Sequence, residues 1–225
     1  MSHTIIIGAG IVGVSAAIWL RRAGQRVTLI DKSGPAAGTS YGNGGVLASC
    51  SIVPVTGPGL IAKAPKMALD PNQPLFVRWP YVPRLAPWLF KYLHHANKAD
   101  TTRIAKALTP IVGDSLADHQ ALAAGTGAER YIAPSDYLFI YNARQHYEGD
   151  AFSWHLRRAN GFTWEELEGP AFKAYDPAFA DHLTFAAKLE NHGRITDPGA
   201  YVNALSAHFE AQGGTFLKAD VTDIT

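Results

Sequence analysis

Three glycines near the start of the chain have the spacing of a phosphate-binding turn, Gly8-Ala9-Gly10-Ile11-Val12-Gly13. Gly8 permits a tight turn, Gly10 lets a pyrophosphate approach the backbone, and Gly13 lets a helix pack closely on a strand. The pyrophosphate would lie against free N–H groups at a helix end that carries about half a positive charge. Ile11 and Val12 belong to the same candidate site, which would bind a dinucleotide.

A carboxylate at a suitable distance completes this motif. Asp31 lies 18 residues after Gly13, close to the spacing of the carboxylate that binds ribose in dinucleotide-binding units. Asp31 can accept hydrogen bonds from both ribose hydroxyls, and its charge would repel a 2′-phosphate, which disfavours NADP. The neighbouring Lys32 is included in the candidate site. FAD and NAD remain as cofactors.

The elements that such a site needs are also present. His3–Ile7 is a β-branched run typical of a strand, Val14–Ala23 indicates an Ala-rich helix ended by Gly24, and Arg26–Ile30 predicts a second strand. The apolar run Thr4–Leu20 resembles a membrane helix, but as a helix it would reach only about 26 Å against roughly 30 Å of hydrocarbon. Its three glycines favour strand, turn and helix instead.

A second glycine-rich segment follows the second strand and reads Gly38-Thr39-Ser40-Tyr41-Gly42-Asn43-Gly44-Gly45. It cannot form a stable helix, and it exposes backbone N–H groups that suit a second part of an extended cofactor. A flexible loop exposed to solvent is the alternative. The segment also matches the GxSxG motif of α/β-hydrolases with Ser40 as nucleophile, but neither the strand nor the helix that this motif requires is predicted beside it.

In these residues the chain resembles the FAD-dependent D-amino-acid oxidase superfamily, and within it the bacterial D-amino-acid dehydrogenases, over their N-terminal half. The likeness rests on Ile5–Asp31, on the second glycine-rich segment, on the Pro- and Trp-rich segment Pro74–Leu93, and more weakly on Gly193–Pro198. The resemblance implies FAD as cofactor. By it, Thr39 and Ser40 would meet the phosphates, Asn43, Gly44, Gly45 and Val46 would line the isoalloxazine ring, and Val221 would bind adenine through its backbone.

The resemblance also implies the reaction. In such relatives the Cα–H of a D-amino acid or amine leaves as a hydride to the flavin, and water hydrolyses the resulting imino acid to a 2-oxo acid and ammonia. A general base is not obligatory if the amine binds neutral, so no catalytic residue is identified. An NAD-dependent dehydrogenase and a non-catalytic nucleotide-binding subunit remain as alternatives.

The expected fold class is α/β. A Rossmann-like FAD-binding core, residues 1–50 and 190–225, is interrupted by an α+β substrate (cap) domain, residues 51–189. Within the insertion we expect a helix from Pro87 to about Ala99, a helix Arg103–Ala124 kinked at Pro110, a strand Tyr137–Tyr141, a helix Arg144–Ala159 and a strand piece Leu183–Ala187. In the core we expect a strand piece Gly193–Ile195, a helix Pro198–Gln212 and a strand Thr215–Ile224.

The fold also looks truncated. The antiparallel substrate sheet of the family, the Arg or Tyr that hold a substrate carboxylate, and a closing glycine-rich segment are not identifiable here. We therefore expect the chain to be about half of a functional enzyme, with the missing C-terminal half or a second subunit as partner.

Composition narrows the classes of function. Of the 225 residues, 17% are charged and 47% hydrophobic, which predicts a packed core. A formal net charge of +1 leaves no excess positive charge with which to bind nucleic acid.

Cys50 is the sole cysteine, which fits a reducing cytoplasm and excludes intrachain disulfides. It could be a covalent flavin anchor or redox thiol, although a small buried residue is favoured. The histidines show no metal-ligand spacing, and no metal is expected.

Eight of the 14 prolines lie between Pro54 and Pro87, interleaved with aromatic and basic residues such as Trp79, Tyr81 and Arg84. Such a segment could dip into a membrane interface, which would suit an enzyme that passes electrons to a quinone. An irregular covering segment of the substrate domain is the favoured alternative. A peripheral place on the inner face of the cytoplasmic membrane is thus one expectation for location.

Overall fold

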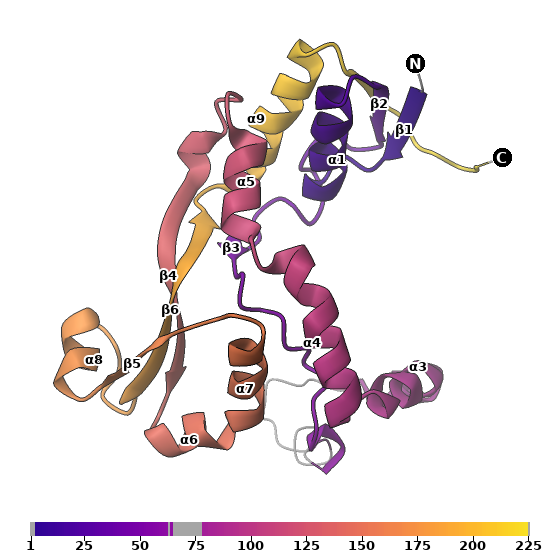
Figure 1. The fold of residues 1–225 in the computed structure, drawn as a ribbon. Helices are drawn as coiled ribbons and strands as arrows, with labels where there is room; N and C mark the ends of the chain where they lie inside the picture. Colours follow the sequence, from indigo (N-terminus) through magenta and orange to yellow (C-terminus); the bar gives the residue numbers. More distant parts are fainter. Residues whose placement is uncertain (1–2, 63, 65–77, 225) are drawn as a thin grey trace. The chain divides into compact units, whose positions relative to one another are not determined.

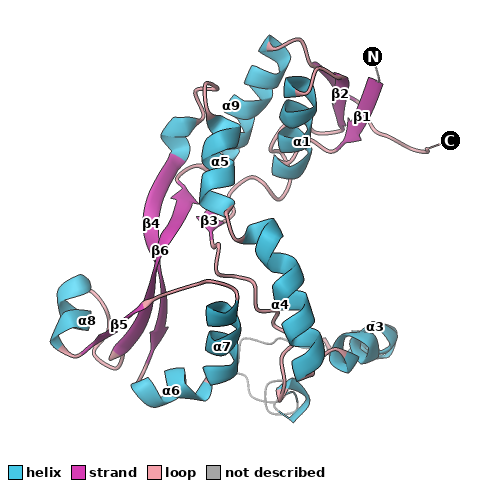
Figure 2. Cartoon of the chain, in the orientation of Figure 1, coloured by secondary structure: helices cyan, strands magenta, loops and turns pink. Residues whose placement is uncertain are grey.

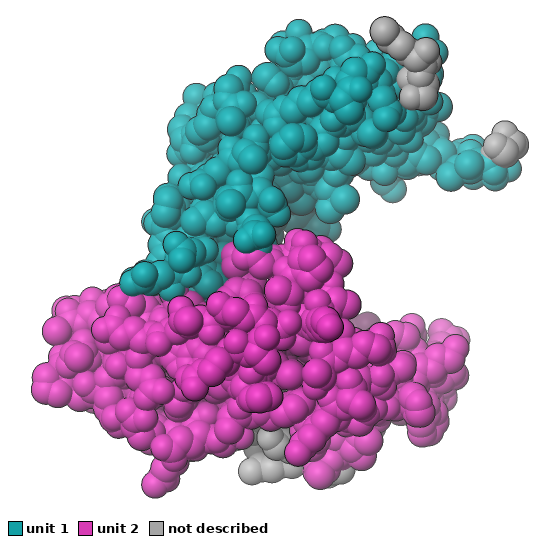
Figure 3. All heavy atoms as spheres, in the orientation of Figure 1, with its two compact units in different colours: residues 1–48, 114–137, 190–225 teal, residues 49–113, 138–189 magenta. Residues whose placement is uncertain are grey.

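The structure is a computed structural model that describes residues 3–62, 64 and 78–224. Its contacts divide the chain into two compact units (Figure 3). Unit 1 comprises residues 1–48, 114–137 and 190–225, and unit 2 comprises residues 49–113 and 138–189.

Unit 1 is built around a parallel sheet with the strand order β1-β2-β7. Figure 1 labels β1 and β2 of this sheet. The strands are β1 (His3–Ile7), β2 (Arg26–Asp31) and β7 (Thr215–Lys218). Helix α1 (Ile11–Arg22) joins β1 to β2, the crossover that parallel neighbours require. The expected α/β fold and its first three elements are therefore confirmed. Strand β7 ends at Lys218, six residues before the expected end at Ile224, so Val221 does not lie on a strand.

Helix α9 (Pro198–Ala211) packs against α1. Val14 and Ile18 of α1 and Leu205 and Phe209 of α9 are all at most 2% exposed and share one core. The side chain of Asp197 accepts a hydrogen bond from the amide of Ala200 at 2.9 Å, which caps the start of α9. The helix expected from Pro198 is thus confirmed to within one residue.

Residues 114–137 belong to unit 1 by their contacts, although the sequence-based division puts them in the insertion 51–189. Helix α5 (Ser115–Ala123) buries Leu122 in the core shared by α1 and α9. The guanidinium of Arg22 on α1 donates to the carbonyl oxygens of Ala121 at 3.0 Å and Leu122 at 2.8 Å. A helix end leaves such carbonyls without helical partners, so this contact joins α5 to α1.

Unit 2 consists mainly of helices (Figure 2). They are η1 (Trp79–Tyr81), α3 (Val82–His94), α4 (Lys98–Val112), α6 (Arg144–Gly149), α7 (Ala151–Ala159) and α8 (Pro170–Tyr175). The single helix expected over 103–124 is wrong, because α4 ends at Val112 and α5 begins at Ser115. The helix expected from Pro87 begins at Val82, and Asp150 divides the one expected over 144–159.

A second sheet has the order β3-β6-β4, and β5 pairs with β6 off this path. Its strands are β3 (Val46–Leu47), β4 (Ile132–Tyr141), β5 (Glu165–Glu168) and β6 (Phe185–Ile195), and η2 (Glu129–Tyr131) precedes β4. The two strand pieces expected near residues 183 and 193 are one continuous strand, β6. Within unit 1, β3 pairs antiparallel with the end of β6, where Val46 lies opposite Arg194.

Candidate cofactor-binding site

The turn between β1 and α1 has the geometry that its three glycines predict. Gly8 has φ +103°, a value that side chains rarely permit, and its amide donates to the carbonyl oxygen of Ile30 at 2.7 Å. A Cβ at Gly13 would overlap the carbonyl oxygen of Gly8, so only glycine lets α1 pack so closely on the turn. Gly10 precedes α1 with an ordinary φ of −74°. A glycine is therefore needed there for the space that a side chain would fill, and not for its backbone conformation.

The carboxylate of Asp31 organises this turn. Its Oδ2 accepts the amide of Ala9 at 2.9 Å, and its Oδ1 accepts the amides of Ser33 and Gly34 at 2.8 and 2.9 Å. The Ala9 amide has the largest effect on the pKa of Asp31, and together with the amides of Ser33 and Gly34 it holds this pKa below its usual value. Burial, the second largest effect, opposes them. Of about four acceptor positions on a carboxylate, three are occupied, which leaves one on Oδ2 for a ribose hydroxyl.

A hollow beside Asp31 brings together four residues that the sequence analysis singled out, namely Gly8, Asp31, Lys32 and Val221. Its other walls are Ile7, Ile30, Ala219 and Asp220. The hollow lies at the carboxyl ends of β1, β2 and β7, which is where open α/β sheets bind their ligands. Val221 reaches it from the loop after β7, so the role expected for this residue does not need a longer strand.

The second glycine-rich segment lies against the start of α1. The hydroxyl of Ser40 is buried and accepts the amide of Ile11, the first residue of α1, at 2.9 Å. A Cβ at Gly10 would come within 3.1 Å of the same oxygen. An oxygen atom therefore lies at the helix end where the sequence analysis expects phosphate oxygens.

Asn43 holds the rest of this segment in shape. Its amide nitrogen donates to the carbonyl oxygen of Thr39 at 3.2 Å, and its Oδ1 accepts the amide of Gly45 at 2.8 Å. Gly45 has φ +62°, and a Cβ there would overlap the carbonyl oxygen of Ile195. The amide of Ile195 in turn donates to Gly45 at 2.6 Å, so the segment is fixed to the end of β6.

A second hollow in unit 1 opens over these contacts. Five residues of the candidate site line it, namely Ile11, Ser40, Asn43, Gly45 and Val46, and its other lining residues are Leu47, His119, Ile195, Pro198, Tyr201 and Val202. The exposed side chains of Thr39 and Val12 and the backbone of Gly44 line neither hollow. Ile11 of the turn and four residues of the second glycine-rich segment thus meet on one hollow.

Sequence reasoning missed His119 and Tyr201, which also line this second hollow. Nδ1 of His119 on α5 lies 2.9 Å from the hydroxyl of Tyr201 on α9. Burial lowers the pKa of His119, partly opposed by the charge of Asp118, and burial raises the pKa of Tyr201. Both side chains are therefore uncharged near neutral pH. They lie 82 residues apart in sequence, and no short motif joins them.

Two other interpretations of the sequence lose support. Ser40 follows no strand directly and precedes no helix, because β2 ends at Asp31 and the next element is β3, so it does not sit on a nucleophile elbow. Cys50 is fully buried, and desolvation raises its pKa to about 11 despite the nearby Arg157. A thiol with so high a pKa carries little of the reactive thiolate.

The parallel sheet, the glycine turn and the carboxylate after β2 define an α/β protein with a dinucleotide-binding unit. A model of the DAO family, described as FAD dependent oxidoreductase, matches residues 3–225, and the chain belongs to this family. FAD, and not NAD, is the cofactor of the family, which confirms the sequence-based expectation.

Similar proteins agree with the family. The chain is 37% identical over 225 residues to a D-amino-acid oxidase of Bradyrhizobium diazoefficiens, which covers 99% of this chain and 53% of the relative. It is 27% identical over 217 residues to a D-amino acid dehydrogenase of Helicobacter pylori, with 96% and 51% covered. The chain thus spans about half the length of the curated relatives it matches.

Solved structures share the fold. Glycine oxidase from Bacillus cereus matches with a TM-score of 0.55 and 16% identity over 94% of this chain and 44% of that one. L-α-glycerophosphate oxidase from Mycoplasma pneumoniae, a structure with FAD bound, matches with a TM-score of 0.58 and 14% identity over 96% of this chain and 45% of that one.

Proposed function

We propose that this chain holds the FAD of an enzyme that oxidises the CH–NH bond of a D-amino acid or a related amine. The product is an imino acid, which water hydrolyses to a 2-oxo acid and ammonia. When bound, FAD supplies the two-electron acceptor for this oxidation. Membership of the family supports the cofactor, and the relatives named D-amino-acid oxidase and D-amino acid dehydrogenase support the substrate class.

One observation in the chain itself carries the proposal. The glycine turn and the second glycine-rich segment meet where the hydroxyl of Ser40 accepts the amide of Ile11. The first amides of a helix have no partner within the helix and attract anions. We infer that the amides of α1 from Ile11 to Gly13 bind the pyrophosphate and that Ser40 moves or shares its bond when the phosphates arrive. Thr39 then contributes from the exposed side of the segment.

The two hollows suit the two ends of the cofactor. Asp31, Lys32 and Val221 would hold the adenosine, with the free acceptor position of Asp31 Oδ2 taken by a ribose hydroxyl. Asn43, Gly45 and Val46 would lie against the isoalloxazine end, and Gly44 would contribute backbone there. We assign substrate binding and turnover to the parts of the relatives that this chain does not span. Either a longer chain or a second chain would supply those parts.

Two measurements test this function. Titration of the purified chain with FAD should perturb the visible flavin spectrum. A protein that joins this chain to the part of the relatives' length that it does not span should oxidise a D-amino acid with an artificial electron acceptor and leave the L-enantiomer unchanged. Binding of FAD by that protein without turnover of any amine would indicate a nucleotide-binding protein and contradict the proposed reaction.

We also propose that α3 contacts an anionic membrane surface, such as the inner face of the cytoplasmic membrane. Trp79, Trp88 and Phe90 are 57%, 57% and 75% exposed, and none of the residues of α3 is buried. From residue 71 to residue 99 the sequence has no Asp or Glu and four Lys or Arg. Exposed aromatic side chains on η1 and α3, and basic side chains on the same segment of the sequence, suit an interfacial contact. Among the described residues no helix is long and apolar enough to cross a membrane.

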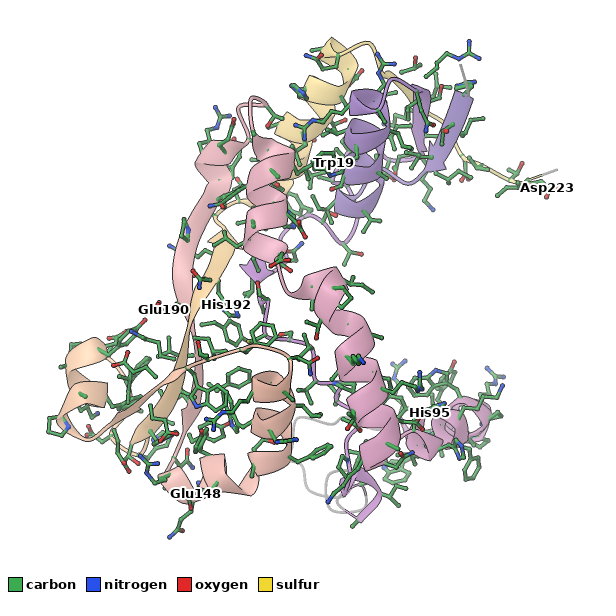
Figure 4. The ribbon with its side chains drawn as sticks, in the orientation of Figure 1. Trp19, His95, Glu148, Glu190, His192 and Asp223 are labelled. Atoms are coloured by element: carbon green, nitrogen blue, oxygen red, sulfur yellow. The ribbon has the colours of Figure 1, made fainter. Side chains whose placement is uncertain are left out.

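Figure 4 labels His95, which follows α3 and pairs with Asp100 of α4 at 3.0 Å. This contact ties the end of α3 within unit 2 and leaves the aromatic residues of α3 available. In a sedimentation assay the chain should bind phosphatidylglycerol vesicles and not phosphatidylcholine vesicles, and Trp88→Ala should weaken binding. Ile111→Ala, a change at a 69% exposed residue of α4, is the matched control. Equal binding by both variants and the wild type would contradict the assignment to α3.

A further inference from the structure

The second hollow of unit 1 has a titratable pair in its wall, His119 and Tyr201. Its other described lining residues are uncharged, and Ser40 and Asn43 are its remaining polar side chains. Both of those already make the hydrogen bonds that shape the glycine-rich segment. The pair, like the hydroxyl of Ser40, keeps hydrogen-bonding capacity that these contacts do not use.

The distances within the pair favour one tautomer of His119. The hydroxyl of Tyr201 is 2.9 Å from Nδ1 of His119 but 3.5 Å from the carbonyl oxygen of the same residue. The longer contact is a poor O–H···O bond, which favours a hydroxyl that donates to Nδ1. In that tautomer Nδ1 is an acceptor, and the neutral imidazole carries its proton at Nε2.

Burial keeps this arrangement uncharged. Tyr201 is 1% exposed, and the pKa shifts of both groups favour their neutral forms. Asp118, the acidic group acting on His119, opposes the shift only in part. Nε2 of His119 has no hydrogen-bond partner among the residues that the structure describes. A half-buried imidazole on the wall of a hollow therefore retains one unused N–H donor.

We propose that His119 is a cofactor-binding residue, whose Nε2–H donates to an acceptor atom of the FAD held in this hollow, and that Tyr201 is a positioning residue that fixes its tautomer. This inference rests on the proposed function. A neutral donor fits the cofactor without adding a charge to the wall, and it reaches the hollow from α5, a helix that the sequence analysis placed outside the nucleotide-binding core.

The test compares two amides that replace different nitrogens of the imidazole. His119→Gln places an N–H donor near the Nε2 position, whereas His119→Asn places its amide near Nδ1, where only Tyr201 can use it. We expect the Asn variant and a His119→Leu variant to bind FAD roughly 2- to 12-fold more weakly than wild type. The Gln variant should retain most of the affinity and the flavin absorption spectrum of the wild-type complex. Tyr201→Phe should weaken binding in the same direction as Asn.

The control is His208→Gln, a change on α9 at a residue that does not line this hollow. Thermal unfolding of each apoprotein separates loss of FAD affinity from loss of fold. Gln and Asn variants of equal affinity and equal flavin spectrum, with wild type binding FAD, would overturn the inference and leave the proposed function standing. A wild-type chain that binds no FAD at all would overturn both.

Discussion

Replacing Asp31 with alanine should destabilise the chain even without a cofactor. The carboxylate accepts three backbone amides, from Ala9, Ser33 and Gly34. Ala9 is fully buried, so its amide would lose its acceptor without gaining water, at about 1–3 kcal/mol. Ser33 is exposed and Gly34 partly so, and water can replace the carboxylate at those two amides. The expected loss of unfolding free energy is therefore about 1–3 kcal/mol.

This contribution of Asp31 depends on pH in a defined direction. The pKa of Asp31 is lower in the folded chain than the roughly 3.9 of an unfolded one. A group whose pKa falls on folding stabilises the fold above its unfolded pKa and loses that effect as pH falls through the folded pKa. The difference between wild type and Asp31→Asn should hold from neutral pH to about pH 5 and shrink below about pH 4.

Urea unfolding followed by circular dichroism measures the loss of stability and its dependence on pH. A parallel titration with FAD measures the effect of Asp31 on cofactor affinity. Loss of one charge-assisted bond to the ribose costs about 1.5–3 kcal/mol, a roughly 10- to 100-fold loss of affinity. A variant Asp31→Ala with the unfolding midpoint of the wild type would refute the role of Asp31 in the turn. Unchanged FAD affinity would refute its role at the ribose.

Three further substitutions test other parts of the site. Gly13→Ala should lower the thermal midpoint and reduce the free energy of unfolding by about 1–3 kcal/mol or more, because its Cβ would overlap the Gly8 carbonyl. The control Gly149→Ala, whose Cβ meets open space, should not lower the midpoint. Asn43→Ala should weaken FAD binding with little change in stability, since Asn43 is exposed and shapes the loop. Asn43→Asp, which keeps an acceptor for the Gly45 amide, should bind FAD better than Asn43→Ala in the same titration. Trp88→Ala should leave both the midpoint and FAD affinity unchanged, and a folded variant that no longer binds FAD would contradict the division of roles between the units.

The first strand, helix and second strand could be predicted because their signals are local. Glycine spacing, a β-branched run and an Ala-rich helix all act within about 30 residues, and the turn at Gly8 follows them closely. Helix α9 was predicted for the same reason, since Asp197 and Pro198 mark its start. Local signals in the sequence are therefore enough to predict these elements.

Other features depend on tertiary contacts that no short pattern encodes. The carbonyls at the end of α5 find their donors in Arg22, about 100 residues earlier in the chain, which assigns residues 114–137 to unit 1. Pro87 lies inside α3, while Pro83 occupies the first turn that the prediction had given to Pro87. Strand β6 continues through Asn191 at φ +61°, between the two strand pieces expected from the sequence. The pairing of His119 with Tyr201 likewise requires the folded core.

The most direct test of the central claim is a titration of the purified chain and its Gly10→Val variant with FAD and, separately, with NAD. The side chain of valine would fill the space beside the Ser40 hydroxyl, where a Cβ already comes within 3.1 Å, and block the approach of a pyrophosphate to α1. We predict that the wild-type chain perturbs the flavin spectrum on binding, shows no binding of NAD, and loses FAD binding in the folded Gly10→Val variant. A folded Gly10→Val protein that binds FAD as the wild type does, or a wild-type chain that binds NAD instead, would contradict the account.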